Sequence, residues 1–482
     1  MKKYLYRFAV FLILIVIGVL TANYLIKNKI EDQLKQQENL QYEDLTFNIL
    51  NGNISFKTVQ FIDDKREIQS EELDINLDLI AYLTDKSLKF NKISADGLGV
   101  IWKATQTTTG SENLDEEITI QKIDIENANF QYKNKNKTLY SLKSINLIAE
   151  DLTWPMQDDL AWLNSVEMTG EELDFDINNL HDLKSESFKM SDGNIEISQF
   201  QIQPKYSKKD YIKYISTEKD RMDLSINTVE IMNFGVENND DIRKFSANKI
   251  LIKDSDFEIY RDKTIADDKS IKPLYSEALR GLGFHLNIDS VQVAGLDITY
   301  QELLRSGATP AEIKFNEING NIANIHNYKR DQTAIISTKA SAKFSESSSI
   351  NFSHNFNPMD TNNQFFVGTS IESVEDSSVN SFFAPALSMK LDGSIDKLRS
   401  KMTSQNNSAS GTLHMAYEEL KIKVLNKNGT ERSFASLLSN VFVKNKNVDV
   451  EHKIQNLKRD ETKSFWNYVW KFIQSGIKKT LL

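Results

Sequence analysis

The chain has no cysteine among its 482 residues and only six prolines. Without cysteine it can form no disulfide, and it has neither a thiol nucleophile nor a cysteine-ligated metal site. Neither sign of charge dominates, since 58 Lys and Arg stand against 68 Asp and Glu, a formal net charge of −10. A nucleic-acid surface would need a clustered basic face. We therefore expect no nucleic-acid partner.

Sequence motifs of catalytic sites are missing as well. The six histidines include no HExxH motif and no pair at a metal-ligand spacing. There is no G-x-S-x-G elbow and no P-loop, and the Gly-Leu-Gly segments at 97–99 and 281–283 lack the third glycine of a dinucleotide fingerprint. We expect neither an enzyme nor a cofactor or metal site, although motifs do not test for a site assembled from scattered residues.

One long apolar run is present, at the amino terminus. Tyr4–Ile26 is 23 residues long, which is enough for one membrane-spanning helix. A cleaved signal peptide is the alternative, but no small-x-small cleavage site follows the run. We expect an uncleaved anchor at residues 1–30. The side chains expected within the bilayer include Phe8, Leu12, Ile15 and Val19.

Basic residues flank this run on both sides. Lys2, Lys3 and Arg7 precede it, and basic residues tend to stay on the cytoplasmic side of a membrane helix. Lys27 and Lys29 follow it and weaken the asymmetry without reversing it. The pattern predicts a single-pass protein with its amino end in the cytoplasm and the rest of the chain outside the cytoplasmic membrane.

A ten-residue phrase recurs along the rest of the chain. Val291–Tyr300 (VQVAGLDITY) is the cleanest copy, with apolar residues at positions 1, 3, 8 and 10 and glycine at position 5. Further copies are Ile93–Trp102, Ile123–Tyr132 and Val166–Phe175, and weaker ones start at Ile145, Val229 and Ile250. A repeated short β-unit predicts one sheet built by accretion rather than a cavity built around a catalytic group.

The phrase contains a break in its alternation. Side chains of a strand alternate between two faces, so positions 1 and 3 would point away from positions 8 and 10 in a flat strand. If both pairs face one core, the strand must bulge between them. Gly, Asn or Asp usually stands at position 5, and these residues tolerate the positive φ that such a bulge uses.

Elsewhere the pattern is also that of half-buried strands. Leu73–Leu79 and Leu173–Ile177 alternate apolar and polar residues. Helical insertions are expected near residues 208–220 and 270–280. The predicted fold is mainly β: an elongated, curved antiparallel sheet or groove with few helices. We divide the chain into the anchor, two β regions at 31–265 and 266–460, and a carboxyl-terminal helix at 461–482.

The carboxyl-terminal segment has helical periodicity. It carries lysines on one face and an apolar stripe on the other, made of Trp466, Val469, Trp470, Ile473 and Ile477. Aromatic residues with lysines at this spacing suit a membrane interface. A helix that plugs the open end of the sheet would show the same pattern. Both interpretations stay open on the sequence.

A curved sheet with one apolar face must cover that face. The sequence offers few amphipathic helices to do so, and an uncovered apolar channel would suit acyl chains. Closure of the sheet on itself is the alternative. The residues expected to line a groove are the apolar positions of two copies of the phrase: Ile123, Ile125, Phe130, Tyr132, Val291, Val293, Ile298 and Tyr300.

The layout resembles the AsmA-like superfamily of envelope proteins, in a Bacteroidota-type branch, over nearly the whole chain. The segments that carry the resemblance follow the anchor in order: GNISF at 52–56, the Leu73–Ile80 strand, the Ile93–Trp102 unit, PKYS at 204–207, DRMDL at 220–224, YRDK at 260–263, YQE at 300–302, IKF at 313–315, Pro385, GSID at 393–396, GTL at 411–413, YEELK at 417–421 and GIKKTLL at 476–482.

The resemblance implies a β-rich periplasmic body on a bacterial inner-membrane anchor. Larger members are thought to carry phospholipid toward the outer membrane along a β-groove, and smaller ones are linked to outer-membrane protein assembly and lipid balance. It therefore implies phospholipid or another acyl-chain lipid as ligand, with the inner membrane as a partner. The alternative is a scaffold or regulator that contacts outer-membrane assembly proteins and holds no lipid.

Overall fold

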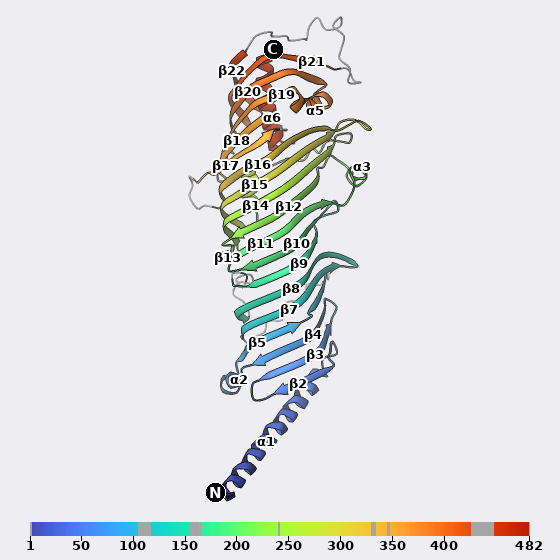
Figure 1. Cartoon of the computed structure of the whole chain (residues 1–482), viewed down its shortest axis with the longest axis vertical. Helices are drawn as coiled ribbons and strands as arrows, with labels where there is room; N and C mark the ends of the chain where they lie inside the picture. Colours follow the sequence, from blue (N-terminus) through green and yellow to red (C-terminus); the bar gives the residue numbers. More distant parts are fainter. Residues whose placement is uncertain are drawn as a thin grey trace. The chain divides into compact units, whose positions relative to one another are not determined.

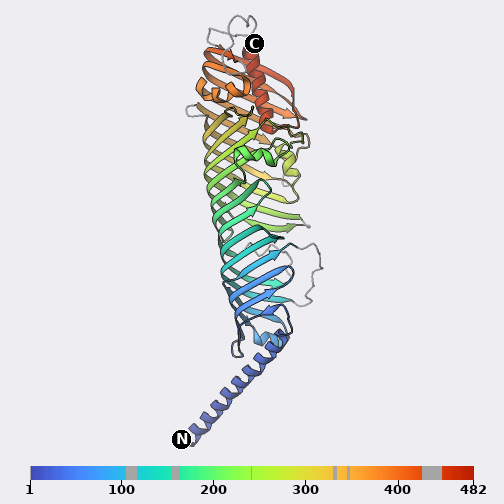
Figure 2. The same cartoon turned by 90° about the vertical axis from the view of Figure 1, so that its right-hand side faces the viewer.

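The computed structural model describes residues 2–104, 117–154, 163, 165–239, 242–328, 334–344, 348–425 and 448–481. The described chain is mainly β, and its strands belong to one mixed sheet of 22 strands with few helices (Figures 1 and 2). By its internal contacts the chain forms two compact units, Met1–Asp176 with Leu183–Ile197, and Ile177–Asp182 with Ser198–Leu482. The mainly-β prediction is confirmed, whereas the boundary between 31–265 and 266–460 stays a prediction.

The first unit begins with a helix and continues as strands. Its elements are α1 Lys2–Leu34, β1 Leu40–Gln41, β2 Asp44–Asn48, β3 Asn53–Ile62, β4 Arg66–Leu77, α2 Leu79–Asp85, β5 Leu88–Asp96, β6 Gly99–Lys103, β7 Ile118–Asn134, β8 Lys137–Trp154 and β9 Glu167–Asp176. The strands β10 His181–Ser191 and β11 Asn194–Pro204 contribute residues to both units.

The described part of the second unit contains the remaining strands and five further helical segments. They are α3 Lys208–Tyr211, the 3-10 turn Ile212–Tyr214, β12 Arg221–Met232, β13 Gly235–Asn239, β14 Ile242–Asp262, α4 Tyr275–Arg280, β15 His285–Leu303, β16 Ala311–His326, β17 Ile336–Phe344, β18 Ser348–Phe356, β19 Phe365–Glu375, α5 Asp376–Leu387, β20 Met389–Gln405, β21 Ser408–Val424, β22 Val448–Lys458 and α6 Phe465–Leu481.

The sheet is mixed, which corrects the expectation of an antiparallel one. From β15 to β22 each strand pairs antiparallel with the next. By contrast, β14 and β15 are parallel, and so are β5 with β7 and β6 with β7. A parallel pair needs a crossover connection rather than a tight hairpin. Between β14 and β15 the crossover is the 22-residue segment 263–284, which includes α4.

The structure places a bulge at position 5 of most copies of the ten-residue phrase. The residues there adopt positive φ: Gly97 (62°), Asn127 (52°), Asn233 (51°), Asp254 (50°) and Gly295 (73°). The pairing register also shifts beside Asn127 and beside Gly295. The predicted break in alternation is thus present in these copies, and its cause is the local backbone conformation.

Two copies bend elsewhere. In the copy that begins at Val166, the positive φ belongs to Glu172 (49°), two residues after Gly170. A Cβ at Gly170 would lie 2.5 Å from Cε1 of the Phe188 ring, so this glycine is needed for close packing rather than for the turn. In the copy that begins at Ile145, Asp151 (54°) takes the corresponding position.

The amino-terminal helix has the expected position. The side chains of Phe8 and Leu12 lie outside the described residues, Ile15 is 47% exposed and Val19 is half-buried. Among the described residues, no helix combines the length and the apolar content that a membrane crossing requires. The transmembrane prediction is therefore without support here, because the described apolar side chains begin only at Leu14 and charged residues follow from position 27.

Each unit has a core of its own. In the first, Leu45, Phe56 and Val59 are buried against the end of α1. In the second, a larger cluster extends across β17–β22 and includes residues of α5 and α6. In the first unit the end of α1 thus packs on the first strands, and in the second unit α5 and α6 pack on the last strands.

Candidate functional site

The first unit has a continuous apolar face across β4, β5, β7 and β8. Ile75 pairs with Ile93, Ile93 with Ile123, and Ile123 with Ala149. Two residues further along β7, on the same face, Ile125 pairs with Leu147. Residues directly opposite each other on neighbouring strands share a face. These apolar side chains therefore form rows that run perpendicular to the strands.

Beyond the bulge the same face continues on the other half of each strand. Phe130 pairs with Val100 on β6 and with Leu142 on β8. Within β7, Ala128 is buried and Phe130 is half-buried, whereas Asn127 and Asn129 are exposed. The inward positions shift by one residue at the bulge, so the apolar residues before and after it enter one face. The predicted residues Ile123, Ile125, Phe130 and Tyr132 are all half-buried on it.

Aromatic rings close one end of this face. Tyr132 stacks on Tyr140 with ring centroids 5.0 Å apart, and Tyr140 stacks on Phe175 at 4.7 Å. Trp102 pairs with Tyr132 and is 44% exposed, with the guanidinium of Arg66 5.9 Å from its ring centroid. An aromatic row with exposed rings and a nearby cation is suited to the boundary between an apolar surface and water.

The second unit repeats the arrangement around β15. Val291 and Val293 pair with Ile250 and Ile252 of β14. On the other side of Gly295, Ile298 pairs with Phe257 of β14 and Phe315 of β16, and Tyr300 with Ile259 and Ile313. All four predicted residues of this copy are half-buried. The structure thus brings each predicted set onto one sheet face within its own unit.

The helices of the described chain pack mainly on other strands. The most extensive contacts are those of α1 with β2, α2 with β5, α5 with β16, β19 and β20, and α6 with β20–β22. Among the described residues, neither cluster of buried apolar side chains includes a residue of β7 or β8. The face of β7 and β8 therefore keeps half-buried apolar side chains, and no described helix contacts these two strands extensively.

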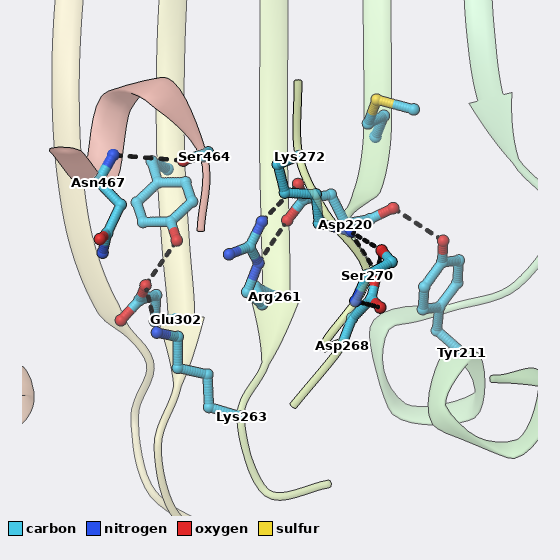
Figure 3. A network of polar contacts seen from close by, with 12 residues as sticks. Tyr211, Asp220, Arg261, Lys263, Asp268, Ser270, Lys272, Glu302, Ser464 and Asn467 are labelled. Carbon is cyan, nitrogen blue, oxygen red and sulfur yellow. Dashed lines mark hydrogen bonds and ion pairs between the residues drawn. The ribbon is translucent and has the colours of Figure 1, made fainter. Parts of the chain in front are cut away.

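A polar network ends the apolar face of the second unit (Figure 3). Arg261 donates from Nε and Nη2 to the two carboxylate oxygens of Asp220, at 2.7 Å each. Burial alone would lower the pKa of Arg261, but the hydrogen bonds and the charge of Asp220 raise it above its usual value. The guanidinium therefore stays charged and paired.

Tyr300 joins the apolar face to this network. Its hydroxyl donates to Oε1 of Glu302 at 2.5 Å. Lys263 Nζ lies 3.2 Å from the same oxygen (Figure 3). Burial raises the pKa of Tyr300, so the phenol remains a protonated donor. These contacts neutralise the charges at this end of β15 and supply no activated nucleophile.

Sequence reasoning missed Asp220, Arg261 and Glu302 as members of one site. Arg261 and Asp220 are 41 residues apart in sequence, and no spacing rule connects them. The segments DRMDL and YRDK, which begin at Asp220 and Tyr260, were noticed only for the family resemblance. Among the described residues, no group of three or more His, Asp or Glu side chains is placed to hold a metal ion.

The carboxyl-terminal helix α6 packs against the sheet. Its inward residues include Phe465, Tyr468, Val469 and Phe472, which are 0–5% exposed. Tyr468 donates from its hydroxyl to the carbonyl of Leu457 at 3.1 Å. Figure 2 shows the helix along the last strands. Of the two interpretations of this segment, packing on the sheet is the one that the described contacts match.

The predicted interface stripe is consequently not the outward face of α6. Val469 is buried, Trp470, Ile473 and Ile477 are half-buried, and Trp466 is 54% exposed. The reason is that α6 has a second apolar stripe, with Phe465, Tyr468 and Phe472, which faces the strands. Contact of the predicted stripe with a membrane stays a prediction and would require the helix to expose residues that now contact protein.

Comparison with models of known protein families finds no match for this chain, and no curated protein matches it.

Proposed function

We propose that this chain is an AsmA-like envelope protein, anchored in a bacterial inner membrane with its body in the periplasm. In this proposal it binds or transfers phospholipid, or another acyl-chain lipid, between envelope membranes and so supports the outer membrane. The observation that carries the proposal is the half-buried apolar face of β7 and β8, which continues across Asn127 without a change of side.

Acyl chains suit such a face because they need a long apolar surface and no specific polar partner. Ile123 and Ile125 precede the bulge, and Phe130 and Tyr132 follow it. Strands advance about 3.3 Å per residue, so these positions offer an apolar strip about 30 Å long within one strand. That is comparable with the hydrocarbon thickness of a whole bilayer, about 30 Å, so a single acyl chain would fit along it.

Exposed side chains of α1 support the anchor. Leu14, Val16, Ile17 and Leu20 are 61%, 52%, 52% and 61% exposed. Together with Ile15, which is 47% exposed, these positions point around the whole circumference of a helix, and a helix that is apolar all round needs a protein core or lipid around it. In the whole sequence the apolar run reaches back to Tyr4, which supports lipid as the surrounding medium.

A second candidate is a scaffold or regulator of outer-membrane protein assembly that holds no lipid. One observation favours it. The face of β17–β22 is filled by a buried cluster to which α6 contributes Phe465, Tyr468, Val469 and Phe472, so the described residues of this part offer an acyl chain a filled face rather than an open one. A scaffold would have both faces closed in this way.

Native mass spectrometry of the full chain distinguishes the lipid-binding protein from the scaffold. The chain is released from the membrane in polymer-bounded discs and then transferred to a mild detergent. The lipid-binding proposal expects stoichiometric phospholipid adducts that survive detergent exchange. The matched sample is a variant with Ile125→Gln and Ile123→Gln, which keeps the strand but makes one row polar, and should lose the adducts. A wild-type chain that is free of lipid after mild release would contradict the proposal and favour the scaffold.

A further inference from the structure

The short helix α2 exposes an apolar face that nothing in the described first unit covers. Asp78 caps its start by accepting hydrogen bonds from the backbone N–H groups of Ile80 and Ala81, at 3.1 and 3.0 Å, and Lys86 ends it with a φ of 54°. Ile80 and Leu83 are one helical turn apart and so share a face. They are 76% and 77% exposed, and no residue of the helix is buried.

A third exposed apolar side chain lies next to this helix. Leu50, in the turn between β2 and β3, is 75% exposed. The turn is fixed to the chain just before α2 by two hydrogen bonds. The backbone N–H of Leu77 donates to the carbonyl of Gly52 at 3.0 Å, and Asn76 Nδ2 donates to the carbonyl of Asn51 at 3.1 Å. Leu50, Ile80 and Leu83 therefore belong to one end of the first sheet unit. We call them the apolar tip.

The tip lies where the amino-terminal helix leaves the sheet. The backbone N–H of Ile49 donates to Oδ1 of Asn23 at 2.6 Å, so Leu50 is level with Asn23 along α1. Next to Asn23, the side chains of Tyr24 and Leu25 are 65% and 61% exposed, as is Leu20 at 61%. Figure 1 shows α2 at the end of the sheet from which α1 extends.

We propose that the apolar tip inserts into the interface of the same membrane that holds α1, so that Leu50, Ile80 and Leu83 form a second membrane contact beside the anchor. This inference rests on the proposed membrane anchoring of α1 and adds to it how the first unit meets the lipid surface. Two membrane contacts side by side fix the orientation of the first strands relative to the membrane, whereas a single helix would let them rotate about its axis.

Lipid is the occupant that the surroundings favour. The tip is continuous with the exposed apolar side chains of α1, and Tyr24 stands at their level, where aromatic residues collect at membrane interfaces. Leucine and isoleucine on one turn of a helix, with the polar groups of the turn directed back to the sheet, are typical of a segment that enters the headgroup region a few ångströms deep. A protein partner would need further complementary polar groups around the tip.

The absence of cysteine makes the test direct, because a single introduced cysteine labels one position. Full-length variants L50C and L83C, each carrying an environment-sensitive fluorophore, are reconstituted into nanodiscs of phosphatidylethanolamine and phosphatidylglycerol. The matched control is I62C, since Ile62 is 44% exposed at the opposite end of β3. I15C reports on the anchor. Quenching is measured with aqueous iodide and with nitroxide lipids labelled near the headgroup or deep in the acyl chain.

We expect the labels at positions 50 and 83 to shift to shorter wavelengths, to resist iodide and to be quenched by the shallow nitroxide lipid. The label at position 62 should remain open to iodide, and that at position 15 should respond to the deep nitroxide. If position 15 is in lipid but positions 50 and 83 stay open to iodide, the tip inference is wrong while the anchor stands. If position 15 also stays aqueous, the proposed anchoring fails and the inference fails with it.

Discussion

Replacement of Phe472 by alanine tests how α6 is held. Phe472 is fully buried, at 0% exposed, and a Cβ added to Gly411 would lie 3.0 Å from its Cζ atom. Removing a buried phenylalanine loses the free energy of its transfer from water and leaves a cavity, together about 3–5 kcal/mol. Leu413 and Met402, also 0% exposed, lie on β21 and β20, whose backbones are each held by pairing on both sides. We expect a loss of about 4 kcal/mol.

The matched control is Trp466→Ala on the same helix. Trp466 is 54% exposed and contacts Phe352 and Phe465 with ring centroids 5.2 Å away in each case. Losing such edge contacts should lower the free energy of unfolding by about 1 kcal/mol. Both variants are compared with the wild type by urea unfolding, followed by tryptophan fluorescence for F472A and by circular dichroism for both.

The reasoning would be refuted if Phe472→Ala were as stable as the wild type, or if Trp466→Ala were the more damaging change. A membrane-bound α6 would show a different pattern. In that case Trp466→Ala would reduce binding to vesicles, and deletion of residues 465–482 would leave the strand content intact. The packed helix instead predicts that this deletion destabilises the strands β20–β22.

The remaining predictions concern single groups. Burial lowers the pKa of His354 from 6.5 to about 4, so protonation of this side chain favours the unfolded chain. Its contribution to the free energy of unfolding should be complete above pH 6.5 and fall by about 3 kcal/mol as the pH drops toward 4. In a series of unfolding curves measured at different pH values, His354→Phe should remove this fall. At Asn127, whose φ is 52°, replacement by valine should lower the free energy of unfolding by about 1–2 kcal/mol more than replacement by glycine. Both changes remove the asparagine side chain, but only glycine adopts the positive φ of the bulge without strain. Equal free energies of unfolding for the two variants would contradict the bulge.

The position of the bulges could be predicted from the sequence, because it depends on local backbone conformation. Gly97, Asn127 and Gly295 stand at the one place where the apolar alternation changes phase. The same rule failed at Gly170, where the reason for glycine is a neighbouring ring and not the turn. A sequence pattern does not separate these two uses of glycine, since the ring belongs to Phe188, on another strand.

Pairing across long connections could not be predicted in the same way. The parallel pairing of β14 with β15 depends on where the segment 263–284 crosses, and the strand pattern is identical for either direction. The orientation of α6 was open for a related reason. Both of its stripes are aromatic and apolar, and only contact with Gly411 and Leu413 decides that Phe472, not Trp466, faces the sheet.

The polar network at the end of the apolar face of the second unit is a third feature that the sequence could not predict. Tyr300 was predicted as a lining residue, and its ring does lie in the row with Ile259 and Ile313. Its hydroxyl, however, takes part in a network with Glu302 and Lys263. Which atoms of an amphipathic side chain face the apolar row depends on charges brought together from separate strands, and this information is absent from any one segment.

Site-specific photo-crosslinking tests lipid binding most directly. A photoreactive amino acid replaces Phe130, which faces the apolar row, or Asn129, its exposed neighbour on the other side of β7, in cells grown with labelled phospholipid. A second pair, Val293 and the exposed Gln292, makes the same comparison on β15. We predict labelled lipid on positions 130 and 293 and none on 129 and 292. No lipid on the inward positions, or equal labelling of both faces, would contradict a lipid-carrying apolar face.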